Sequence, residues 1–188
     1  PPPHPPPPPP HPFFQEEDGI LYLVLSLVGS DMCIRDSSSG EEMGYNDWDG
    51  DHFLTTSKCS TIAYQEAGIT DPRQEISMME VHDCFSITEL VTMEDLHISE
   101  RGGAVNDIMD GFFDLDSGLP CQPDGGLKCF GHPIGASGLR MLYEMYLQLH
   151  GRAGERQVSD PRYGLTHNLG GMPHMNISSI TIVGRHGE

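Results

Sequence analysis

The segment Gly125–Arg140, GGLKCFGHPIGASGLR, constrains this chain more than any other part of it. It places His132 between Gly131 and Pro133 and then leads into an amphipathic stretch. Glycine lets a backbone come close to a neighbouring group, and proline fixes the backbone angle φ of its own residue. The segment therefore predicts a stiff loop that presents a histidine just before a helix. A plain surface turn is the competing interpretation of this segment taken alone.

Helical and extended patterns alternate along the chain, which indicates an α/β fold with a mixed sheet flanked by helices. The expected helices cover residues 53–67, 86–96 and 138–150, with a weaker helical turn over 106–113. The expected strands cover residues 76–81, 164–168 and 177–183.

Four residues are predicted to begin or end these helices. Gly68 should cap the first helix at its C-terminus, and Ser137 should cap the last one at its N-terminus. Ser86 and Glu89 have the spacing of a capping box. The buried face of the last helix is predicted to carry Leu139, Leu142, Tyr146 and Leu149.

The composition excludes several classes of partner and location. A formal charge of −18 argues against nucleic acid and anionic membranes, since both would repel the chain. The apolar run Ile20–Val28 is too short to span a bilayer and lacks the basic flank of a signal peptide. Five cysteines without a secreted pattern favour a reducing compartment, and the C-terminus has no peroxisomal tripeptide. We therefore expect a cytoplasmic protein.

The first 37 residues are set apart from the rest. Residues 1–12 contain only proline and histidine, and residues 12–37 resemble translated sequencing-adapter read-through. We expect residues 1–37 to be a disordered artefact and the folded domain to comprise residues 38–188.

Two further segments give the glycine-rich loop a context. Val81–Phe85 reads VHDCF, and Gly164–Gly171 reads GLTHNLGG. The three segments in this order resemble the C-terminal half of a thiolase of the sterol-carrier-protein type, over about residues 44–185. The resemblance implies one half of a layered αβαβα fold. It also implies an acyl-CoA C-acyltransferase that condenses thioesters or cleaves 3-oxoacyl-CoA by thiolysis.

The resemblance also implies roles for particular residues. His132 would activate a thiol and donate a hydrogen bond to a thioester oxygen. His82 would help to form the first oxyanion hole, where ordinary thiolases carry an asparagine. Cys84 would supply the acid/base thiol that ordinary thiolases take from a later cysteine, and Asn168 stands at that later position here. Gly170 would offer its backbone N–H to the second oxyanion hole.

Alternative interpretations of these and nearby residues stay open. Free cysteines are often small buried core residues, so Cys84 could be one. His167 is as easily structural as catalytic. Asp83 is expected to bind backbone N–H groups of the turn that follows it. Glu144 and Glu155 are expected on solvated faces.

The pairs His82-x-Cys84 and Cys129-x-x-His132 could together hold zinc. The His-x-Cys spacing is atypical and both pairs fall inside the thiolase motifs, so we expect no metal. We likewise expect no bound cofactor, with the coenzyme A thioester acting as substrate.

The chain offers no nucleophilic cysteine of the kind that the first half of a thiolase supplies. Cys59 falls in a predicted helix, while Cys121 and Cys129 belong to C-terminal-half segments. We therefore expect a missing N-terminal half, no activity from this chain alone, and a homodimeric parent enzyme. The alternatives are a non-catalytic acyl-CoA-binding subunit, with an OB-fold zinc-ribbon protein as a possible partner, or a lyase that cleaves sterol-type side-chain thioesters.

Overall fold

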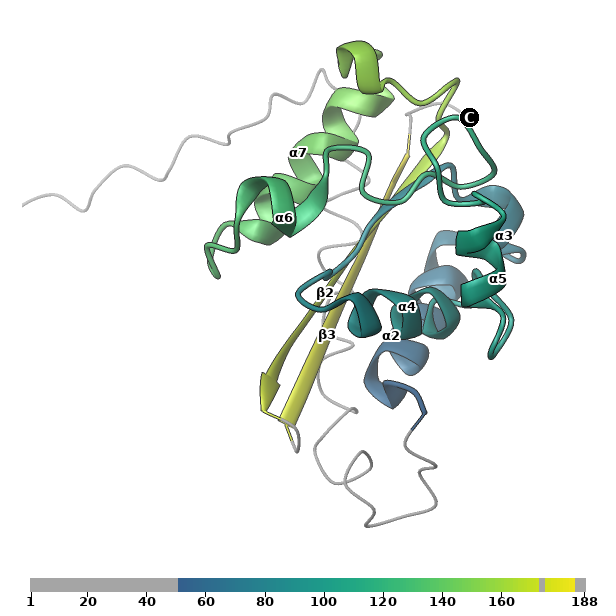
Figure 1. Ribbon diagram of the computed structural model, residues 1–188, viewed down its shortest axis with the longest axis vertical. Helices are drawn as coiled ribbons and strands as arrows, with labels where there is room; N and C mark the ends of the chain where they lie inside the picture. Colours follow the sequence, from purple (N-terminus) through teal and green to yellow (C-terminus); the bar gives the residue numbers. More distant parts are fainter. Residues whose placement is uncertain (1–50, 173–174, 185–188) are drawn as a thin grey trace, which may run out of the picture.

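The computed structural model describes residues 51–172 and 175–184, which form a mixed α/β structure as predicted (Figure 1). The predictions for residues 1–37 and for the boundary at residue 38 lie outside this part. The helices are α2 (Leu54–Ala67), α3 (Pro72–Glu75), α4 (Ser86–Asp95), α5 (Ala104–Met109), α6 (Gly126–Phe130) and α7 (Ser137–Leu149). The strands are β1 (Met78–Glu80), β2 (Tyr163–Met172) and β3 (Met175–Gly184), and a 3-10 turn covers Gly154–Arg156.

The three strands form one sheet in the order β1-β2-β3. β1 runs parallel to β2, with Met78 opposite Gly164 and Glu80 opposite Thr166. β2 and β3 form a long antiparallel hairpin, from Tyr163 opposite Gly184 onward. A parallel pair needs a long crossover, and the chain between β1 and β2 provides it with α4 to α7. The C-terminal end of β1, at Glu80, therefore lies beside Thr166, near the middle of β2.

Helices cover both faces of the sheet: Figure 1 shows α6 and α7 on one side, with α2, α3, α4 and α5 on the other. Successive residues of a strand point to opposite faces. On β2, His167 bonds Thr56 of α2, whereas the side chain of Asn168 lies beside Gly138 of α7. Neighbouring residues of β2 thus serve different faces of the sheet.

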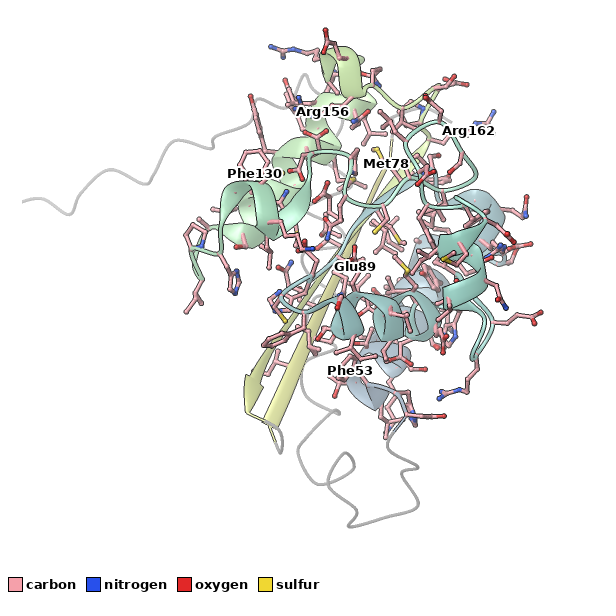
Figure 2. The ribbon with its side chains drawn as sticks, viewed as in Figure 1. Phe53, Met78, Glu89, Phe130, Arg156 and Arg162 are labelled. Carbon is pink, nitrogen blue, oxygen red and sulfur yellow. The ribbon has the colours of Figure 1, made fainter. Side chains whose placement is uncertain are left out.

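Each face has its own hydrophobic core. The larger core joins the sheet to α2 and α4, and its buried residues include Cys59, Ala63, Met79, Met93, Ile180 and Ile182. The smaller core joins the sheet to α7 and contains Met78, Met145, Leu149, Val158 and Val183; Met78 is labelled in Figure 2. Burial of apolar surface on both faces fixes the sheet between two helical layers.

The last helix, α7, departs from its predicted capping and phase. Ala136 occupies the capping position without a side-chain bond, and the Ser137 hydroxyl instead donates to the carbonyl oxygen of Pro133 at 3.3 Å. Leu139 is 68% exposed, whereas Met141 and Met145 are fully buried. The predicted cap was therefore wrong, and of the predicted face Leu139 was wrong, whereas Leu149 is buried and Leu142 packs against the smaller core.

The other predicted caps gave mixed outcomes. Gly68 adopts a left-handed conformation with φ of 72° and donates its N–H to Gln65, so the predicted C-cap of α2 is confirmed. α4 begins at Ser86 but has no side-chain cap, because Phe85 holds the capping position. The Glu89 carboxylate instead accepts a hydrogen bond from the Cys121 thiol at 3.8 Å. The capping box was therefore wrong.

Glu144 was predicted to be solvated, but it is only 3% exposed. Arg156 holds both of its carboxylate oxygens, with Nε 3.0 Å from Oε1 and Nη2 2.9 Å from Oε2. Gln148 donates to the same Oε1 at 2.9 Å. A carboxylate is tolerated in the interior when it is paired and hydrogen-bonded in this way. Glu155 is exposed, as predicted.

Candidate active site

The loop that follows β1 carries His82, Asp83 and Cys84. The strand ends at Glu80, so these side chains project beyond its C-terminal end, before α4 begins. His82 is 8% exposed and its Nδ1 atom is buried, with no hydrogen-bond partner among the described residues. Cys84 is an exposed free thiol whose Sγ lies 3.8 Å from Oγ1 of Thr88. The alternative that Cys84 is a buried core residue is therefore wrong.

The second loop, between α6 and α7, presents His132 to solvent. Its Nδ1 atom lies 2.8 Å from Oγ of Ser137, the first residue of α7. In the tautomer in which Nδ1 of His132 carries the proton, Nδ1–H donates to the Ser137 hydroxyl, which in turn donates to Pro133. This assignment leaves Nε2 of His132 as the basic nitrogen that can take a proton.

The two histidines meet although 50 residues separate them. The ring centroids of His82 and His132 are 5.1 Å apart, with an edge-on angle of 65° between the planes. Burial lowers the pKa of His82, and the neighbouring His132 lowers it further. His82 is therefore neutral near pH 7 and can donate a hydrogen bond without carrying charge.

Asp83 ties the two loops together. Its two carboxylate oxygens each lie 3.1 Å from the backbone N of Leu127, on α6. A Cβ atom on Gly126 would lie 2.4 Å from Oδ2 of Asp83, and Gly126 has φ of +62°, so the close approach requires glycine. Asp83 does bind a backbone N–H, but that N–H belongs to α6 and not to the turn that directly follows Asp83.

β2 contributes Asn168 and Gly170 to the α7 side of the sheet. A Cβ atom on Gly138 would lie 3.4 Å from Nδ2 of Asn168, so this amide lies against the first turn of α7. Gly170 is exposed two residues further along the strand. Asn168 thus lies beside the helix whose first residue, Ser137, contacts His132.

His167 lies on the other face of the sheet. It is fully buried, and its Nε2 atom lies 3.1 Å from Oγ1 of Thr56 on α2. Burial lowers its pKa to about 3, and the nearby His82 lowers it in the same direction. The structure therefore places His167 in the core between β2 and α2, away from Cys84 and His132.

The residues of the alternative zinc site do not converge as a ligand set. In the part of the chain that the structure describes, no three or more histidine, cysteine, aspartate or glutamate side chains form a group that could hold a metal ion.

Within the same part, none of the helices has the length and apolar character needed to cross a membrane.

Sequence reasoning missed several residues that hold the site. The Ser137 hydroxyl was interpreted as a helix cap, yet it contacts His132. Glu80, Arg140 and Asp124 form a buried charged cluster behind the two histidines. Arg140 ends the glycine-rich segment that was singled out, and its position there was the available signal.

The comparisons with known proteins show the family to which the chain belongs. Residues 45–185 match the family model described as "Thiolase C-terminal domain-like". The chain belongs to this family. It is 45% identical over 97 residues to an acetyl-CoA acetyltransferase of Methanothermobacter thermautotrophicus, across 52% of this chain and 25% of that protein. It is 32% identical over 157 residues to sterol carrier protein 2 of Homo sapiens, across 84% of this chain and 28% of that protein. The predicted thiolase resemblance is thereby confirmed.

A solved structure supports the fold of this thiolase C-terminal domain. The "Ltp2-ChsH2(DUF35) aldolase" superposes with a TM-score of 0.63 at 21% identity, across 77% of this chain and 35% of that one. At this identity the likeness establishes the fold alone. The chain spans about a quarter of the length of the two curated relatives above.

Proposed function

We propose that this thiolase-type domain supplies the C-terminal catalytic residues of an acyltransferase that condenses acyl-CoA thioesters or cleaves 3-oxoacyl-CoA by thiolysis. The contact between His82 and His132, centroids 5.1 Å apart beyond the end of β1, is the observation that carries the proposal. The reaction needs hydrogen-bond donors at thioester oxygens and a base beside them. Two imidazoles that face each other, with an exposed thiol on the same loop, can provide both.

Each residue has a step in this reaction. After His132 Nε2 takes its proton, a cysteine of the N-terminal half would attack the carbonyl of a first acyl-CoA; the enzyme thioester forms as the bond to coenzyme A breaks, and coenzyme A leaves as the thiol with that proton. The Cys84 thiolate would remove a proton from the carbon next to the carbonyl of a second thioester. The resulting carbanion attacks the acyl carbonyl, and the thiolate of the N-terminal cysteine leaves. Thiolysis follows the same steps in reverse.

Charge develops on thioester oxygens during these steps. His82, kept neutral by burial, would donate a hydrogen bond to one oxygen together with His132. The backbone N–H of Gly170 would serve the second oxyanion hole, with Asn168 beside it in place of the later cysteine of ordinary thiolases. His167 is assigned a structural role because it faces α2.

The test uses a full-length enzyme that carries this domain and measures thiolysis of acetoacetyl-CoA. Positioned proton transfer is worth about 10²–10⁴ in rate, so Cys84→Ala should lower kcat by that factor. His132→Ala should lower it further, because the change removes both a base and a hydrogen-bond donor. Cys129→Ala is the matched control, since Cys129 is also an exposed free thiol. Near-normal turnover by Cys84→Ala would contradict the assignment. Partial rescue of Cys84→Ala by Asn168→Cys would strengthen it.

A carbon–carbon lyase is the second candidate, favoured by the fold likeness to a structure named as an aldolase. A lyase releases its products without free coenzyme A, whereas thiolysis consumes it. A non-catalytic subunit would bind acyl-CoA without turnover, alone or with an OB-fold zinc-ribbon partner. Turnover only with free coenzyme A indicates the thiolase, turnover without it indicates the lyase, and no turnover under either condition indicates the subunit. Mass measurement in solution tests the expected homodimer.

A further inference from the structure

A buried group of charges lies behind the histidine pair, formed by Glu80 on β1, Asp124 before α6 and Arg140 on α7. We refer to it as the Arg140 cluster. Arg140 Nη1 lies 3.0 Å from Oε2 of Glu80 and hydrogen-bonds Oδ2 of Asp124. Glu80 is fully buried, and the Arg140 and Asp124 side chains are largely buried. One guanidinium thus joins two carboxylates from different elements.

Two members of the cluster, Glu80 on β1 and Arg140 on α7, lie close along the chain to residues of the histidine pair. Glu80 precedes His82 by two residues, and both side chains project to the α7 side of the sheet, toward Arg140 and His132 respectively. Arg140 lies in the first turn of α7, three residues after Ser137, whose hydroxyl bonds His132. A shift of α7 relative to β1 would therefore change the distance between the two rings.

Asp124, the third member of the cluster, contacts the start of α6, the helix that precedes the His132 loop. Asp124 Oδ1 accepts a hydrogen bond from the backbone N of Gly126 at 2.8 Å, at the start of α6. The next backbone N–H, that of Leu127, is bonded by Asp83 beside His82. The two helices that flank the His132 loop are thus both tied to β1. α7 is tied to Glu80 through Arg140, and α6 is tied through Asp124 and through Asp83, which follows the strand.

Several buried polar atoms of the cluster lack hydrogen bonds, which argues against a purely stabilising role. Both carboxylate oxygens of Glu80 and the Nε and Nη2 atoms of Arg140 are buried without an aligned hydrogen bond from the described residues. Burial and the nearby Asp124 raise the pKa of Glu80, while the Arg140 guanidinium lowers it. Buried charges of this kind often stabilise a fold less than apolar side chains of the same volume, so stability alone does not account for the cluster.

We propose that Arg140 is a positioning residue that sets the separation of His82 and His132 by holding α7 and the start of α6 against β1. The inference rests on the proposed function for its effect on rate. The ring contact itself can be measured without any reaction.

The experiment compares Arg140→Met with Arg156→Met. Arg156 is the matched control because it also pairs with a buried glutamate of α7, Glu144; Figure 2 shows it near the end of that helix, away from Phe130. Kinetics are measured on a full-length enzyme carrying this domain. The ring contact is measured on the chain itself by nuclear Overhauser effects between the labelled imidazoles of His82 and His132.

Arg140→Met should lose the inter-ring effect and lower kcat about 10²-fold with little change in KM, since a misplacement of about 1 Å can cost that factor. Arg140→Lys should restore part of both, because its ammonium can replace the single Nη1 that makes both contacts. Arg156→Met should keep the inter-ring effect and kcat.

Unchanged rings and kcat in a folded Arg140→Met would overturn the inference, as would an equal loss in Arg156→Met. If Arg140→Met does not fold, Glu80→Met decides: it removes both carboxylate oxygens that face Arg140 at a similar side-chain length, and an unchanged ring contact would overturn the inference. If the full-length enzyme shows no thiolysis, the proposed function fails, and the ring contact alone supports or refutes the role of Arg140.

Discussion

His167 is buried in its neutral form, so the domain should lose stability as the pH falls. Its pKa is about 3 in the folded chain, against 6.5 for an ordinary histidine, so the unfolded chain binds a proton in a range where the folded chain does not. The stability is fully present above the unfolded pKa and declines through the window between the two values. From pH 7 to pH 5 the predicted loss is about 2 kcal/mol, at 1.36 kcal/mol per pKa unit.

The assay is urea unfolding of the chain and of His167→Gln at both pH values. Glutamine can still donate a hydrogen bond to Thr56 but does not titrate, so its loss should be smaller by about 2 kcal/mol. His150→Gln, which removes an exposed imidazole, is the matched control and should follow the unchanged chain. Equal losses in the unchanged chain and in His167→Gln would refute the reasoning.

Three further predictions concern residues that the fold or the site holds in unusual surroundings. Burial raises the pKa of Asp95 to about 7, so its ionisation costs stability as the pH rises through the range from about 4 to 7; Asp95→Asn should gain stability relative to the unchanged chain between about pH 5 and pH 8 in urea unfolding. Gly126→Ala should cost at least about 1 kcal/mol by the same method, because its Cβ would meet Asp83 at positive φ; a neutral outcome would mean that the loops do not approach so closely. Ser137→Ala should lower kcat of a full-length enzyme about tenfold by freeing His132, with unfolding curves as the check on stability.

The sequence was sufficient for those features that depend on neighbours along the chain. The left-handed cap at Gly68 follows from glycine alone, and the strands around Met79 and Ile180 follow from local patterns of apolar residues. The motif around His132 predicted a loop that presents a histidine before a helix, and the structure has this loop. Such features need no knowledge of which distant segment packs against them.

The errors arose where a partner outside the local pattern decides the outcome. Ser137 has the residue type and position of a cap, but the histidine five residues earlier takes its hydroxyl. Glu144 belongs to a polar residue type, yet its pairing with Arg156 allows it to be buried, while Leu139 of the same helix is exposed. A hydrophobicity pattern counts Glu144 as solvated, so it misses that this position faces the interior.

The same dependence on distant partners explains the histidines. Burial lowers the pKa of His82 and of His167, and the neighbouring rings act in the same direction, His132 on His82 and His82 on His167. The two buried rings therefore remain neutral hydrogen-bonding groups, while His132, whose ring is exposed, is the base in the proposed reaction. The sequence motifs predicted which residues matter. Only the fold, through the connection from β1 to β2, determines which of these histidines are buried and which one is exposed.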